Sequence, residues 1–236
     1  MIPLYENKIN RKVRVFISST FSDMQNERNI IVHSVFPRLR KNFSAKLIDI
    51  TEVDLRWGIP EEDSENSRIL EICIGEVLHC SPFFVGMIGD RYGSIAPEDA
   101  VNNLPPAYRK ALGSEIPPGL SITELEMRAG VFVPKNVDFS CFLVKDTVLN
   151  NPELQPEVTN LVSHIDNTYK MLSYSSDSEF EDLLYDNMYD YISKVIPDDL
   201  EIPYDDTAYL SHLKILKSNN YRYIPDNYFI VNLERK

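Results

Sequence analysis

Two glutamates at the start of one predicted helix are the residues of this sequence best suited to chemistry on a sugar. They lie in the run Ser121-Ile122-Thr123-Glu124-Leu125-Glu126. Ser121 and Glu124 have the spacing of a capping box, in which each side chain satisfies a backbone N–H of the first turn. Glu126 has no such role, and its carboxylate could hold a sugar hydroxyl or stabilise an oxocarbenium-like charge. The alternative is a solvated helix glutamate, which the sequence alone favours.

A hydroxyl-rich loop follows the first predicted strand, which covers Val13-Arg14-Val15-Phe16-Ile17. Hydroxyls between a strand and a helix N-terminus can form a rim that binds an anion or a ribose. Capping of the next helix by Ser22 or Asp23 explains the same loop equally well. The candidate ligand-binding residues of this loop are Ser18, Ser19, Thr20 and Phe21.

The run Asp54-Leu55-Arg56-Trp57-Gly58 contains the only tryptophan of the chain. Asp54 and Arg56 could contact a polar ligand while Trp57 stacks on a ring. The alternative, slightly favoured, is a tryptophan packed over the sheet edge beside an internal ion pair.

Several kinds of site are not indicated. The three cysteines, Cys73, Cys80 and Cys141, fit no zinc or disulfide spacing, and their apolar surroundings predict buried thiols in a reducing compartment. The four histidines are scattered, so we expect no metal site. The sequence has no P-loop, no GxGxxG and no GxSxG motif.

Composition and charge narrow the class of protein. The chain has 236 residues, 43% of them hydrophobic, which is enough for a large core. Its net charge of −12 would repel a phosphate backbone, so we expect no nucleic-acid partner. No apolar run approaches the roughly 18 residues of a membrane span, and the N-terminus has no signal-peptide pattern. We therefore expect no membrane partner and a cytoplasmic location.

The elements that must position these residues alternate along the chain. Strands are predicted at 13–17, 45–53, 82–88 and 139–144. The first helix places Met24, Ile31, Val35 and Leu39 on one face, with Glu27 and Arg28 off it, and Pro37 should kink or end it. Helices are also predicted at 67–79 and 121–131.

A long connection spans residues 94–120 and holds one short helix near 105–112, so it could be a functional lid. The alternation as a whole predicts a parallel α/β sheet with helices on both faces. In such sheets ligands bind beyond the carboxyl ends of the strands.

The composition changes after Asp146 and becomes helical, acidic and tyrosine-rich. Helices are predicted at 155–172 and 178–195. We therefore expect an α/β domain at 1–148, a helical extension at 149–200 and a connector at 201–236 that leads toward a further domain of a longer protein.

Six motifs occur in the order found in one family of domains. They are Phe16-Ile17-Ser18-Ser19-Thr20-Phe21-Ser22-Asp23-Met24 with Glu27-Arg28, Val35-Phe36-Pro37-Arg38-Leu39-Arg40, Asp54-Leu55-Arg56-Trp57-Gly58, Phe83-Phe84-Val85-Gly86, Gly89-Asp90-Arg91-Tyr92-Gly93 and the run from Ser121 to Glu126. Together they resemble the TIR-like domain at the N-terminus of many STAND ATPases, the NACHT-type signalling proteins that often end in WD or TPR repeats. Telomerase-associated proteins and bacterial immune proteins carry the same module.

The resemblance implies a flavodoxin-like fold and self-association or binding of an effector protein, in an antiviral or innate-immune setting. It also implies an alternative, because some TIR enzymes cleave NAD with one glutamate after the lid. Glu126 matches that glutamate best, since Ala129 and Gly130 follow it, and Glu124 is the rival. NAD would then be a substrate, with no bound cofactor. The motifs add Arg91, Tyr92 and Ser121 to the candidate ligand-binding residues.

Overall fold

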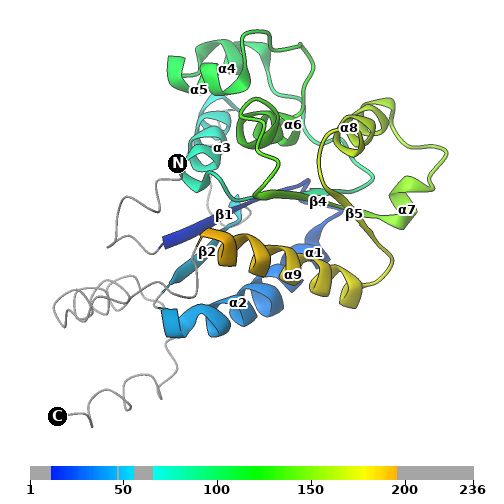
Figure 1. The fold of residues 1–236 in the computed structure, drawn as a ribbon. Helices are drawn as coiled ribbons and strands as arrows, with labels where there is room; N and C mark the ends of the chain where they lie inside the picture. Colours follow the sequence, from blue (N-terminus) through cyan, green and yellow to red (C-terminus); the bar gives the residue numbers. More distant parts are fainter. Residues whose placement is uncertain (1–11, 47, 56–65, 196–236) are drawn as a thin grey trace, which may run out of the picture. The chain divides into compact units, whose positions relative to one another are not determined.

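A five-stranded parallel sheet forms the centre of the computed structural model (Figure 1), counted over the residues that the structure describes, 12–46, 48–55 and 66–195. The strand order is β2-β1-β3-β4-β5, and every pairing is parallel. This is the flavodoxin-like order, so the predicted fold class is confirmed. The strands are β1 (Lys12–Ser18), β2 (Asp49–Val53), β3 (Phe84–Ile88), β4 (Ser140–Lys145) and β5 (Met171–Tyr174).

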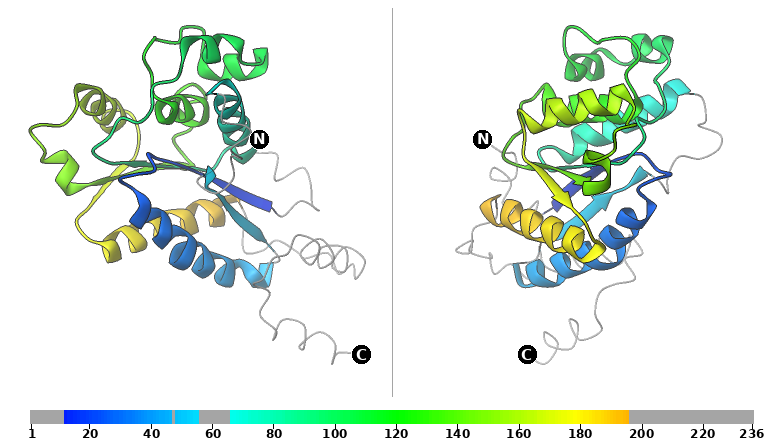
Figure 2. Two further views of the ribbon diagram at one scale, coloured as in Figure 1. Left: turned by 180° about the vertical axis from the view of Figure 1, so that it is seen from behind. Right: turned by 90° about the vertical axis from the view of Figure 1, so that its right-hand side faces the viewer.

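The central strand β3 is buried along its whole length, as expected for an apolar strand covered on both faces. Figure 2 shows the two covering layers of helices. One layer packs on Val13, Val15 and Ile17 of β1 and contains α1 (Gln25–Ile30), η2 (Ile31–Val35), α2 (Phe36–Phe43) and α9 (Asp177–Val195). The other layer contains α3 (Asn66–Cys80), α6 (Ile122–Met127), η6 (Arg128–Phe132) and α8 (Pro156–Asp166).

The helix after β1 begins and continues differently from the prediction. Met24 is the N-cap residue and no side chain caps this end in the described structure, so capping by Ser22 or Asp23 is wrong. Pro37 does not end the helix, which passes through the π-helical turn η2 and continues to Phe43. A π-helical turn widens the helix locally, which gives the proline ring its place at the start of α2.

The connection at 94–120 is folded. It contains α4 (Glu98–Asn103), which was not predicted, and α5 (Pro106–Leu112), which was. Its two ends are tied together, because the Ala96 N–H donates to the Leu120 carbonyl at 3.0 Å and the Ile122 N–H to the Ser94 carbonyl at 2.9 Å. The two ends therefore enter and leave the sheet region side by side.

The segment expected to be a helical extension contains a strand. The helix predicted at 155–172 ends at Asp166, and residues 171–174 form β5, which pairs with β4. A short helix, α7 (Asp146–Leu149), precedes it, and α9 matches the helix predicted at 178–195. β5 has only four residues and one of them is buried, so its sequence carries little alternation. The predicted connector at 201–236 lies outside the described residues.

In the part of the chain that the structure describes, no helix combines the length and the apolar character that a membrane span requires.

Candidate functional site

The carboxyl ends of β1 and β3 meet at the point where the strand order reverses, which is where flavodoxin-like sheets bind ligands. Ser18 is the last residue of β1, Ser19 and Thr20 begin the loop after it, and the loop after β3 contains Arg91 and Tyr92. Helix α6 adds Glu126. The main candidate site residues from the sequence therefore lie at one edge of the sheet.

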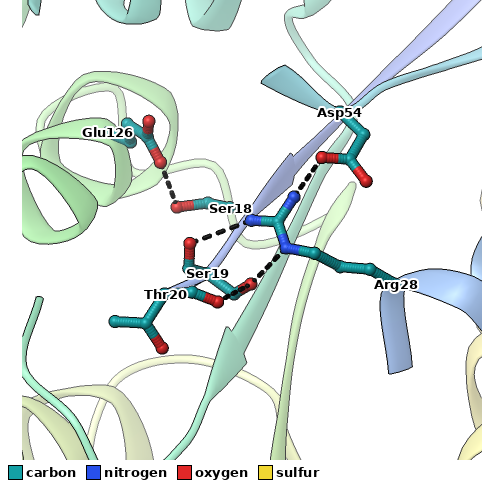
Figure 3. A network of polar contacts seen from close by, with 6 residues as sticks. All are labelled: Ser18, Ser19, Thr20, Arg28, Asp54 and Glu126. Carbon is teal, nitrogen blue, oxygen red and sulfur yellow. Dashed lines mark hydrogen bonds and ion pairs between the residues drawn. The ribbon is translucent and has the colours of Figure 1, made fainter. Parts of the chain in front are cut away.

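Glu126 lies against the end of β1 and is nearly enclosed (Figure 3), with 8% of its surface exposed. The Ser18 hydroxyl donates to Glu126 Oε2 at 2.6 Å. Burial raises the pKa of the Glu126 carboxyl to about 7, against the opposing effects of the Ser18 hydrogen bond, the Arg28 charge and a hydrogen bond from Cys73. Both protonation states are therefore populated near neutral pH.

Arg28 ties the ends of β1 and β2 together and is only 1% exposed. Its Nε donates to the Ser19 hydroxyl at 2.8 Å and its Nη2 to the Ser19 carbonyl at 2.9 Å. Its Nη1 forms an ion pair with the buried Asp54 carboxylate. Figure 3 shows the guanidinium between these partners. Arg28 was expected off the buried face, and that expectation is wrong.

Asp23 joins the loop after β1 to the loop after β3. The Thr20 hydroxyl donates to Asp23 Oδ1, and Asp23 Oδ2 accepts the Arg91 N–H at 3.2 Å. The Ser19 hydroxyl also donates within the protein, to the Thr20 carbonyl at 2.9 Å. The hydroxyls of Ser18, Ser19 and Thr20 thus all donate to protein groups, so an anion bound by them would have to replace these bonds.

Helix α6 begins as the sequence predicts, but only half of the capping box forms as expected. The Ser121 hydroxyl caps the helix by accepting the Glu124 N–H at 3.1 Å. The Glu124 carboxylate instead accepts a hydrogen bond from the Tyr92 hydroxyl at 2.6 Å. Burial and the neighbouring Glu124 raise the pKa of Tyr92 to about 12. Glu124 therefore bonds to the loop after β3, whereas Glu126 bonds to the end of β1.

The remaining sequence candidates divide into two groups. Phe21 is exposed, with the Arg28 guanidinium 4.7 Å from its ring centre, and Arg91 is exposed as well. Arg56 and Trp57 lie outside the described residues.

A second buried cluster, which the sequence reasoning missed, lies at the ends of β4 and β5. The Glu27 carboxylate, 1% exposed, forms an ion pair with Lys145 Nζ at 2.7 Å and accepts a hydrogen bond from the Tyr174 hydroxyl at 3.1 Å. Burial and Glu27 together raise the pKa of Tyr174. The sequence feature that could have indicated this cluster is the pair Glu27-Arg28, which follows the loop after β1. Both residues were instead expected to lie off the buried face of the helix.

Among the described residues, no group of three or more His, Cys, Asp or Glu side chains could hold a metal ion.

Comparison with known proteins gives a family match and several partial relatives. A family model described as "Domain of unknown function (DUF4062)" matches residues 14–189. The chain is 44% identical to telomerase protein component 1 of Mus musculus over 50% of this chain and 4% of that protein. It is 28% identical to a TPR repeat-containing protein of Dictyostelium discoideum over 93% of this chain and 15% of that protein. It is 30% identical to NACHT and WD repeat domain-containing protein 2 of Homo sapiens over 40% of this chain and 6% of that protein.

The chain thus spans between 4% and 15% of the length of these relatives. Among solved structures it is similar to diflavin flavoprotein A3 from Nostoc sp., with a TM-score of 0.32 and 11% identity over 80% of this chain and 96% of that one.

Proposed function

The chain belongs to the DUF4062 family, and from this premise we propose that it acts as a signalling domain of a larger, STAND-type NTPase of the antiviral or innate-immune kind. The names of its relatives include NACHT, WD repeat and TPR regions, and those relatives are much longer than this chain. In this proposal the larger protein brings copies of the domain together. The domain then acts through contacts between copies or with an effector protein.

The observation that carries this proposal is the closure of the polar cluster around Glu126. The Ser18 hydroxyl donates to Glu126, the Ser19 hydroxyl to the Thr20 carbonyl and the Thr20 hydroxyl to Asp23, so all three hydroxyls bond within the protein. Beside this cluster the surface is apolar at two positions, because Phe21 is 48% exposed and Ile95 is 52% exposed. A β-carbon on Gly93 would lie 3.2 Å from Thr20 Cγ2, so the two loops that carry Phe21 and Ile95 are in contact. This edge therefore suits a protein contact.

The cytoplasmic location is part of the same proposal. All three cysteines are free and buried, which supports a reducing compartment.

The test imposes a dimer on the full chain by an inducible dimerisation module and measures further association by sedimentation velocity. We expect species larger than the imposed dimer, and we expect Phe21→Asp or Ile95→Asp to remove them. Val137→Asp is the matched control, because Val137 is 50% exposed and lies just before β4, at the amino end of the strands. A chain that remains at the imposed dimer at all concentrations, or three variants that behave alike, would count against homotypic contacts at this edge.

A second candidate function is NAD cleavage with Glu126, and one observation favours it. A buried carboxyl with a pKa near 7, at the edge where such sheets bind nucleotides, is typical of a catalytic acid or base. A ligand would have to reach Glu126 past the loop after β1.

The clustered chain, incubated with NAD, decides this candidate by the release of nicotinamide measured chromatographically. Loss of release in Glu126→Gln with retention in Glu124→Gln would assign the reaction to Glu126, and the reverse result would assign it to Glu124. A clustered and folded chain that releases no nicotinamide excludes the enzyme.

A further inference from the structure

A cavity of about 400 Å³ lies within the folded 94–120 connection. Its walls come from α4, α5 and the loop at 113–120, and Leu125 of α6 completes it. Cavities of roughly 300–1,000 Å³ are the usual size of small-molecule sites. Glu126 is not among the residues that line it, so the cavity is distinct from the cluster at the end of β1.

Hydrogen bonds hold two parts of the cavity wall in place. Ala96 and Leu120, which both line the cavity, are joined by a backbone hydrogen bond. Arg128 donates to the Leu112 carbonyl at 3.3 Å and to the Glu115 carbonyl at 3.0 Å, which fixes the loop after α5. The cavity therefore has walls held by hydrogen bonds as well as by packing.

The lining combines an apolar surface with a pair of cations. Val101, Ile116 and Leu120, all partly exposed, supply the apolar part. Arg109 and Lys110, consecutive on α5, supply two positive charges in a chain whose net charge is −12.

The two cations are available to a ligand. Arg109 Nη1 donates to the Asn102 carbonyl of α4 at 3.3 Å, which holds the guanidinium across the gap between the two helices. Within the described part of the chain neither Arg109 nor Lys110 forms an ion pair, whereas Arg14, Arg28, Arg38 and Arg40 all do. Glu98 lines the same cavity, so its charged side chains sum to one positive charge.

We propose that this cavity binds a small organic anion. The apolar body of the ligand packs on the surface that includes Val101 and Leu120, and its carboxylate, sulfonate or phosphate group binds Arg109 and Lys110. Charge-assisted hydrogen bonds to the two cations supply the specificity for an anion.

Two fluorescent probes of similar apolar body test this proposal on the full chain. 8-Anilinonaphthalene-1-sulfonate carries a negative group and N-phenyl-1-naphthylamine carries none. We expect saturable binding of the sulfonate, weakened by about tenfold or more in the double variant Arg109→Gln/Lys110→Gln, because each charge-assisted bond contributes substantially to affinity. Binding of the uncharged probe should be unchanged in that variant. Val101→Phe should reduce binding of both probes by filling the cavity.

The matched control is Lys12→Gln/Lys41→Gln, which removes two exposed charges outside the cavity. It should bind both probes like the unaltered chain, and the melting temperature of every variant confirms folding. The proposal is overturned if the unaltered chain binds no sulfonate probe saturably, or if Arg109→Gln/Lys110→Gln and the control weaken binding equally. Sulfonate binding that Val101→Phe leaves unchanged overturns it as well.

Discussion

Glu27 and Arg28 are neighbours in the sequence, yet they bind opposite halves of the sheet. Arg28 binds Ser19 after β1 and Asp54 after β2, whereas Glu27 binds Lys145 at the end of β4 and Tyr174 at the end of β5. Successive helix residues point in different directions, so one turn of α1 reaches four strand ends. These two side chains therefore fix the edge at which the candidate site lies.

Asp54→Asn tests the buried ion pair with Arg28. Asp54→Asn removes the charge of one ion-pair partner of the buried Arg28, so we expect a loss of about 3 kcal/mol in the free energy of unfolding. Asp182→Asn is the matched control, since it removes the exposed pair between Arg38 and Asp182 and should cost about 1 kcal/mol or less. Urea unfolding measures both. Equal effects of the two substitutions would contradict a structural role for the buried pair.

Glu126 makes the stability of the fold depend on pH. Its pKa is about 7 in the folded chain and close to 4.5 when unfolded, so the folded state keeps a proton that the unfolded state has lost between these values. The contribution of Glu126 to stability therefore falls as pH rises from about 4.5 to 7 and is constant above that range. The shift corresponds to about 3 kcal/mol at most.

Glu126→Gln replaces the carboxyl with an uncharged side chain of the same shape and should remove this loss. We expect the variant to be more stable than the unaltered chain at pH 7.5, with the difference vanishing near pH 4.5, in urea unfolding measured across that range. Glu98→Gln, at an exposed position, controls for the loss of one negative charge. A difference between Glu126→Gln and the unaltered chain that does not vary with pH would contradict the assigned shift.

At the scale of elements, the loops after β1 and β3 depend on the absence of a side chain at Gly89. A β-carbon at Gly89 would lie 2.1 Å from Asp23 Oδ2. Asp23 could not then keep its bonds with Thr20 and the Arg91 N–H. Gly89→Ala should therefore cost about 1–3 kcal/mol of stability in urea unfolding, the usual penalty of an overfilled site.

The double variant Asp23→Ala/Gly89→Ala separates this clash from other effects of the new methyl group. We expect its cost to be less than the sum of the two single variants, because the clashing carboxylate is gone. Gly75→Ala is the control, since its β-carbon would meet only the end of the Tyr108 side chain at 3.0 Å. Additive costs would show that Asp23 is not the group displaced.

The elements that the sequence predicted well are those with a strong local pattern. β3 is an unbroken apolar run, and α3 repeats apolar residues at helical spacing, so both follow from the sequence alone. β5 was missed because four residues with one buried side chain give no periodic signal. Its place is decided by pairing with β4, which is a tertiary effect.

The candidate site was predictable in position but not in its contacts. The Ser121 cap places Glu126 one turn into α6, and parallel strands bring Ser18 to the same edge. The burial of Arg28 was not predictable, because charged residues are rarely fully buried without a partner and that partner, Asp54, comes from a different strand end.

At the scale of the whole molecule, the sheet does not stop at residue 148. β5 pairs with β4, and α9 places Leu184, Met188 and Ile192 in the same core as Val13 and Val85. The described residues, 12–46, 48–55 and 66–195, therefore share one sheet and its two helix layers. A boundary at 148 would leave one face of the sheet without α9 and one edge of β4 without its neighbour.

Truncation after residue 148 should therefore prevent cooperative folding, while truncation after residue 198 should not. The shorter chain loses the apolar side chains of α9 that cover α2 and the sheet, and an exposed core surface of this kind leads to aggregation or to a loosely packed state. Near-ultraviolet circular dichroism and urea unfolding compare the two chains. The point variant Leu184→Ala, in the full chain, should cost about 2–5 kcal/mol because it opens a cavity in the same core. If a chain of residues 1–148 unfolds cooperatively and Leu184→Ala lowers the free energy of unfolding only slightly, the domain ends at 148 and α9 is an accessory helix.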